Sequence, residues 1–179
     1  MSSRSNTRLR ARTFAGSAIT GLLLALASCG VPDAVDLSTD PPGPWSRVSV
    51  SGEFSLELPP ELAVEPERGV DSLYRVYRSD ALVVSVDYGW YSNSLADIAG
   101  DELERKTIQV DGRSAAHVRY RDQAADSGLE YVVGLHVPDT GKGQVRLTLV
   151  ARTRSEHDRD RAERILRSLR FLYATPPAE

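Results

Sequence analysis

The chain contains few of the residues on which enzymatic and metal sites depend. Its 179 residues include one cysteine, Cys29, and three histidines. A single cysteine forms no disulfide within the chain, so the fold must be held together by its core. There is no Cys-x-x-Cys, His-x-x-Glu-His or Gly-x-Ser-x-Gly sequence. We therefore predict no catalytic residue, no metal site and no cofactor.

The first 28 residues lack acidic side chains and carry four arginines, Arg4, Arg8, Arg10 and Arg12. An apolar run follows from Phe14 to Ala27. A basic start, a short apolar stretch and small residues at its end are typical of a secretory signal peptide. The alternative is a transmembrane anchor, but a helix needs about 20 apolar residues to cross a bilayer.

The apolar run ends in Leu26-Ala27-Ser28-Cys29, which resembles the lipobox of bacterial lipoproteins. The resemblance implies cleavage before Cys29 and a lipid anchor on that residue. Gly30 follows the cysteine, where an Asp tends to retain enteric lipoproteins at the inner membrane. We expect a protein of the cell envelope, at the outer membrane if the organism has one.

Removing the signal peptide leaves 18 basic and 25 acidic residues, a net charge of −7. An acidic protein is a poor nucleic-acid binder, because contacts to phosphates dominate that affinity. We therefore expect no nucleic-acid partner.

The mature chain divides into three segments by composition. Residues 29–44 comprise the lipidated N-terminus and a tether rich in proline. Residues 45–173 are long enough for one domain with its own core. Residues 174–179 are expected to be a disordered tail.

Strand patterns dominate the domain. Asp111-Gly112 is the strongest hairpin signal. Two helices are also predicted: one over Leu95–Lys106, capped by Ser94, and one after Ser155, with Ala162, Ile165, Leu166 and Leu169 buried. The predicted strands cover residues 47–50, 54–58, 73–78, 82–88, 108–110, 114–120, 129–137 and 145–151.

This order indicates an α+β domain, a central antiparallel sheet with helices packed on it. Three segments resemble the Mog1/PsbP-like group: the strand from Phe54 to Pro59, the hairpin from Val110 to Arg113, and the last helix ending Ile165–Phe171. The resemblance implies an α/β/α sandwich. It implies little about function, because this fold serves unrelated binding roles.

Two of the histidines lie on neighbouring predicted strands. Matching the apolar faces of these strands places Val118 against Tyr131, Ala116 against Val133 and Arg119 against Glu130, and the last of these is a favourable pair of opposite charges. In that register His117 and His136 share a face but lie about 13 Å apart along it, too far for one metal ion.

One segment is a candidate for binding: Tyr88, Trp90 and Tyr91 lie where a strand ends. Loops carry binding functions, and aromatic residues with polar tips suit interfaces. The alternative is that Trp90 or Tyr91 packs in the core.

We expect a non-catalytic binding or interaction module whose partner is an envelope protein or small ligand. Two alternatives stay open. One is a structural or assembly subunit of an envelope machine, which an exposed apolar patch would favour. The other is a small periplasmic hydrolase, which a histidine beside a serine and an acid in a cleft would favour.

Overall fold

The computed structural model describes residues 44–65, 72–125 and 127–173. The predicted signal peptide, the predicted lipidation site Cys29, most of the predicted tether and the predicted C-terminal tail lie outside these residues. Within the described ranges, no helix has the length and apolarity needed to cross a membrane.

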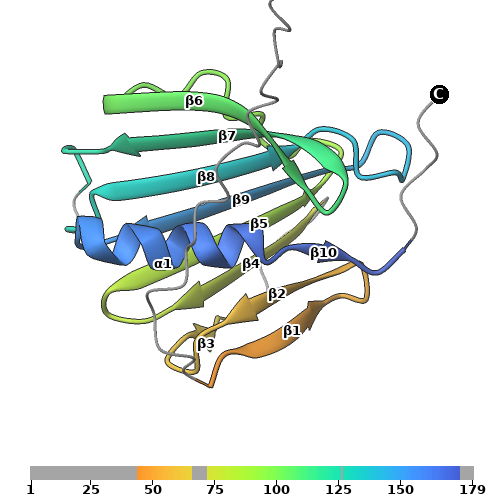
Figure 1. Ribbon diagram of the computed structural model, residues 1–179, viewed down its shortest axis with the longest axis horizontal. Coiled ribbons are helices and arrows are strands. Elements are labelled where there is room, and N and C mark those ends of the chain that lie inside the picture. Colours follow the sequence, from red (N-terminus) through yellow and green to blue (C-terminus); the bar gives the residue numbers. More distant parts are fainter. Residues whose placement is uncertain (1–43, 66–71, 126, 174–179) are drawn as a thin grey trace, which may run out of the picture. The chain divides into compact units, whose positions relative to one another are not determined.

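The larger of two antiparallel sheets has seven strands in the order β3-β4-β5-β9-β8-β7-β6 (Figure 1). Each of the eight predicted strands is present, and the structure adds the two-residue strands β3 and β10. The strands of this sheet are β3 (Ala63–Val64), β4 (Leu73–Arg78), β5 (Leu82–Gly89), β6 (Asp101–Val110), β7 (Arg113–Arg121), β8 (Tyr131–Val137) and β9 (Arg146–Thr153).

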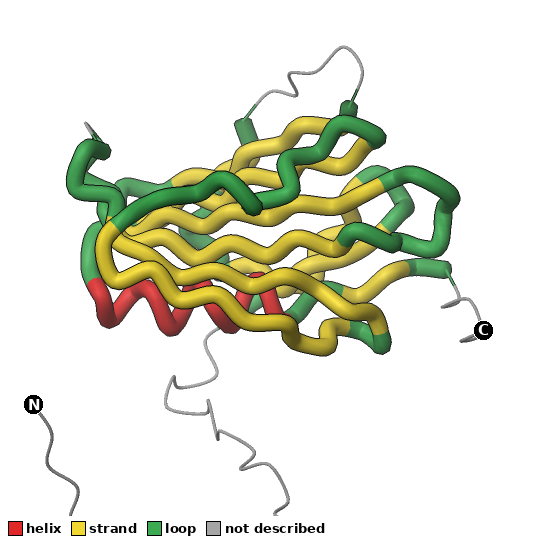
Figure 2. Tube along the Cα trace, turned by 90° about the horizontal axis from the view of Figure 1, so that it is seen from above, coloured by secondary structure: helices red, strands yellow, loops and turns green. Residues whose placement is uncertain are grey.

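A second layer covers one face of this sheet. It comprises helix α1 (Glu156–Arg167) and a small sheet of β1 (Ser46–Val50), β2 (Phe54–Leu58) and β10 (Arg170–Phe171). Figure 2 shows the helix running along the sheet. Ser155 caps α1 as predicted, because its side chain accepts a hydrogen bond from the backbone N–H of Asp158. The predicted buried stripe of Ala162, Ile165, Leu166 and Leu169 is confirmed.

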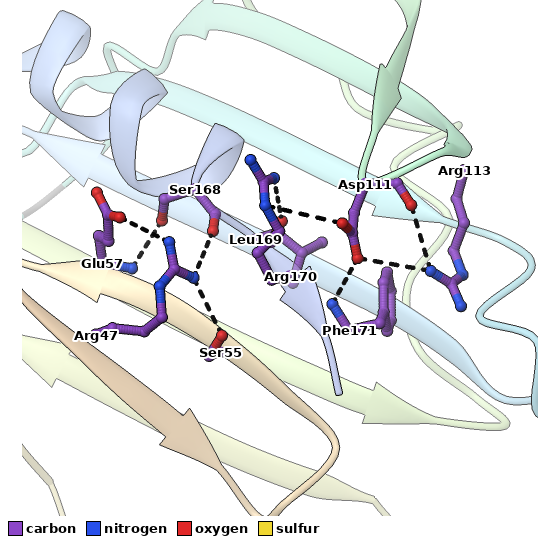
Figure 3. Close-up of polar contacts among 9 residues, drawn as sticks. All are labelled: Arg47, Ser55, Glu57, Asp111, Arg113, Ser168, Leu169, Arg170 and Phe171. Atoms are coloured by element: carbon purple, nitrogen blue, oxygen red, sulfur yellow. Dashed lines mark hydrogen bonds and ion pairs between the residues drawn. The ribbon is translucent and has the colours of Figure 1, made fainter. Parts of the chain in front are cut away.

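Polar contacts fix the junction between the helix and the small sheet (Figure 3). The guanidinium of Arg47 donates to the carbonyl oxygen of Ser168 at 3.1 Å, and Asp111 Oδ2 accepts from the backbone N–H of Phe171 at 2.7 Å. The Asp111-Gly112 hairpin is therefore also the anchor of β10.

The opposite face of the seven-stranded sheet, here called the outer face, is covered by a loop and not by a helix among the described residues. Residues 90–100 cross it, and Leu95 covers a small apolar cluster with Val118, Tyr120 and Val132. The predicted helix over Leu95–Lys106 is therefore wrong, and so is the α/β/α layering. The fold is mostly antiparallel sheet, with one helix in the described part of the chain.

Close packing explains why this segment does not form a helix. A side chain at Gly100 would place its Cβ 2.5 Å from the Tyr120 ring. Leu95 has a φ of 60°, outside the helical region. Ser94 accepts from the backbone N–H of Ala96 in a short turn, and Arg105 on β6 donates to the carbonyl oxygen of Leu95. The apolar residues thus cover the sheet from an irregular segment.

The predicted register of β7 and β8 is also wrong. Val118 lies opposite Gly134, three residues from the predicted position, and Glu130 pairs with Arg121 instead of Arg119. An odd shift moves side chains to the other face. His117 and His136 therefore lie on opposite faces of the sheet.

Candidate binding surface

Three aromatic side chains lie exposed where β5 ends, and we call Tyr74, Trp90 and Tyr91 the aromatic corner. Trp90 is 61% exposed, Tyr91 84% and Tyr74 38%. The alternative that Trp90 or Tyr91 packs in the core is therefore wrong. Rings of this size are normally covered, so three together mark a surface available for contact.

Sequence reasoning missed Tyr74, because its proximity to the loop arises from strand pairing. Tyr74 lies opposite Asp87 on the neighbouring strand β5. Asp87 precedes Trp90 by three residues. Since Asp87 and the loop residues 92–93 share the outer face, Tyr74 lies on that face beside the loop. Side chains alternate between the two faces of a strand, so the sequence of β4 could have indicated that Tyr74 points outward. It could not have indicated that Tyr74 lies beside the loop after β5.

Tyr88 differs from the other candidates because it faces the core. Its ring centroid lies 5.6 Å from that of Phe54, and its hydroxyl donates to Glu53 at 3.2 Å. Burial raises the pKa of this phenol. Tyr88 therefore fixes the end of β5, while the exposed rings beyond it are free to make contact.

A buried polar cluster ties the aromatic loop to the outer face. Thr148 Oγ1 lies 2.6 Å from the carbonyl oxygen of Asn93, 2.6 Å from Ser92 Oγ and 2.8 Å from His136 Nδ1. Thr148 has one proton, which its hydroxyl donates to the Asn93 carbonyl. The Ser92 hydroxyl donates its own proton to the carbonyl oxygen of Asp87 at 3.0 Å, and the Thr148 oxygen accepts from a proton on His136 Nδ1. We call Ser92, Asn93, His136 and Thr148 the loop clasp.

The clasp does not have the arrangement of a hydrolase. Ser92 and Thr148 are each 3% exposed, so a substrate has no access to either hydroxyl. Asp87, the acid opposite Thr148 on β5, accepts a hydrogen bond from the backbone N–H of Asn93. Burial and the positive charge of Arg146 lower the pKa of His136, against the opposing effect of Asp87. The imidazole is thus held neutral as a structural donor.

The other buried histidine lies under the helix. His117 Nε2 is 2.7 Å from Glu163 Oε2, and Glu163 Oε1 accepts from Arg167 at 2.8 Å. Each face of the sheet thus carries one buried histidine: His117 bonds to Glu163 on one face, and His136 bonds to Thr148 on the other. Among the described residues, no group of three or more His, Cys, Asp or Glu side chains could hold a metal ion.

No protein-family model matches the chain, and no curated protein sequence does. The structure is similar to the solution structure of cyanobacterial PsbP (CyanoP) from Synechocystis sp. PCC 6803. The two chains are 14% identical, and the match covers 82% of this chain and 98% of the other, with a TM-score of 0.50. A likeness at this identity concerns the fold, which is PsbP-like.

Proposed function

We propose that the mature protein is a non-catalytic, lipid-anchored binding module of the cell envelope that makes its contacts through the aromatic corner. The observation that carries this proposal is the exposure of Trp90 and Tyr91 at the end of a strand whose following loop is held by the buried clasp.

The clasp supports a binding role because it removes freedom from the loop before any partner arrives. Binding costs the entropy of the side chains and loops that become ordered, and a preorganised loop avoids part of that cost. Trp and Tyr are also enriched among the residues that dominate interface affinity.

The localisation rests on the sequence. The lipobox ending at Cys29 supports acylation of that residue, and Gly30 after it favours an outer-membrane destination in an organism that has one. Replacing Cys29 with Ala should abolish acylation and leave the precursor uncut. Metabolic labelling with a fatty acid checks this, and an acylated Cys29→Ala chain would contradict the anchor.

The binding role is tested by a photoreactive phenylalanine analogue placed at Tyr91 of the full chain in its own cells. A matched control carries it at Val64, which is 60% exposed and lies on edge strand β3. We expect position 91 to form adducts with an envelope component and position 64 to form few. Equal yields at the two positions would contradict a binding role for the corner.

An assembly subunit would use the same exposed rings, and the crosslinked material separates the two alternatives. Adducts of one defined mass with subunits of a larger complex would favour an assembly role. Adducts with a free protein, a small ligand or lipid would favour a simple binding module.

A further inference from the structure

We propose that the partner of the aromatic corner is the lipid–water interface of the bilayer that carries the acylated Cys29. This rests on the proposed function, because it takes the anchor on Cys29 as given. The domain then lies with β5's end against the membrane, and the anchor and the corner are two contacts of one chain with one bilayer.

The chemistry of the corner fits this interface. All three rings are of the Trp and Tyr type, each with an apolar body and one polar group. Such residues concentrate at the headgroup level, where the ring is buried and the polar group stays hydrated. Five large hydrophobic residues are exposed in the part of the chain that the structure describes, and three of them form the corner.

The charge around the corner fits a neutral headgroup layer. Arg146 lies opposite Gly89 at the strand end, and Asp87 lies opposite Tyr74, so charges of both signs lie near the rings. With a net charge of −7, the mature chain would be repelled by an anionic surface. Contact with the bilayer should therefore depend on ring burial and change little with salt.

The length of the tether fits the same orientation. β1 starts at Ser46 and runs toward the end of the domain where Phe54 stacks on Tyr88, so the tether joins the domain about 16 Å along the strand from that end. Fifteen residues separate Cys29 from Trp45, and a flexible coil of that length would span about 20 Å r.m.s.. The distance along β1 that the tether would have to bridge for a domain resting on its corner is therefore within that span.

A tether also makes a weak contact effective. Once the acyl chains are inserted, contact of the corner is an intramolecular event at high effective concentration. Three rings need not hold the domain on a bilayer alone; they need only orient a domain that is already attached.

The two tryptophans provide an internal comparison, because Trp45 packs against Arg164 and lies at the other end of β1 from the corner. The acylated mature chain is reconstituted into phosphatidylcholine vesicles that contain no other protein and carry a nitroxide quencher near the headgroups. The Trp45→Phe variant reports Trp90, and the Trp90→Phe variant reports Trp45.

We expect the quencher to reduce Trp90 emission at least twofold more than Trp45 emission, and 0.5 M salt to leave the difference unchanged. Replacing Tyr74 and Tyr91 with Ser in the Trp45→Phe chain should reduce the quenching of Trp90. The control Val64→Ala in the same chain should leave it as it was.

Equal quenching of the two tryptophans, or stronger quenching of Trp45, would overturn the proposal. If the chain floats with the vesicles while Trp90 stays unquenched and position 91 crosslinks to a protein, the bilayer is not the partner, but the anchor and the binding role stand. If the chain does not float with the vesicles, the anchor fails and the proposal fails with it.

Discussion

Nε2 of His117 lies 2.7 Å from Oε2 of Glu163, which joins the middle of β7 to the helix that covers it. Glu163 is 6% exposed and also accepts a hydrogen bond from Arg167. Burial alone would raise the pKa of Glu163, but its contacts with His117 and Arg167 outweigh burial and lower that pKa to about 2. The helix is thus attached to the sheet partly through an ionised carboxylate.

We expect this contact to weaken in acid. Because the folded pKa of Glu163 lies below its ordinary value of 4.5, its contribution is fully present above that value and is lost as the pH falls toward 2. Glu163→Gln should lower the free energy of unfolding at pH 7, and the difference from wild type should shrink below about pH 4.5. Urea titrations at several pH values measure this.

Asp160→Asn is the matched control for that series, because it removes an exposed carboxylate from the same helix. A Glu163→Gln chain whose deficit stayed constant from pH 7 to pH 3 would show that the carboxylate does not stabilise the fold through its charge.

His136 should respond to pH in a higher range. Its folded pKa lies below its ordinary value of 6.5, so its contribution is present above that value and is lost as the pH falls below it. His136→Asn keeps an amide donor near the position of Nδ1 but does not titrate. We expect the wild type to lose more stability than this variant between pH 7 and pH 5. His157→Asn, at an exposed position, should behave as wild type; parallel pH curves for wild type and His136→Asn would contradict the prediction.

Gly134 provides a test of how the outer face is covered. A Cβ at this position would lie 2.7 Å from Val118 Cγ2 and 2.9 Å from Leu95 Cδ1. We expect Gly134→Ala to destabilise the fold by about 1–3 kcal/mol through overpacking, as measured by denaturant unfolding. Adding Val118→Ala removes one of the crowded atoms, so the double variant should lose less than the sum of the two single variants. Strict additivity would mean that the two positions do not compete for space.

The parts of the fold that the sequence predicted well are governed by local chemistry. Asp111 and Gly112 both have positive φ, which is what the predicted two-residue hairpin turn requires. The helix after Ser155 has its cap and buried stripe within a few turns of chain. In these elements a few neighbouring residues determine the conformation.

The remaining features depend on contacts between distant residues. The stripe of Leu95 and Ile98 has helical spacing, but the sheet's outer face needed a cover, and Gly134 offers a recess for Leu95. The register of β7 and β8 was predicted by matching apolar faces, and the Arg119–Glu130 charge pair agreed with that match. Apolar side chains recur along both strands, and Glu130 has an alternative partner in Arg121. Whether Trp90 is covered depends on where the rest of the chain lies, which the local sequence does not encode.

The exposure of Trp90 and Tyr91 predicts that the two rings contribute little to folding. Surface substitutions away from special features usually change stability by less than about 0.5 kcal/mol. The Trp90→Ala, Tyr91→Ala double variant should therefore melt close to wild type. Leu166→Ala, on the buried side of α1, should cost about 2–5 kcal/mol, because it leaves a cavity against the sheet.

The two variants together separate binding from stability. The double aromatic variant should keep its melting temperature yet lose contact with the envelope in living cells, measured by crosslinking from a third corner position, Tyr74. Leu166→Ala should lower the melting temperature. The molecules of this variant that remain folded should crosslink from position 74 as well as the wild type does. A marked drop in melting temperature for the double variant would mean that the rings stabilise the fold. The two rings would then have a structural role in the loop, and this result would contradict the proposal that the corner is the binding surface.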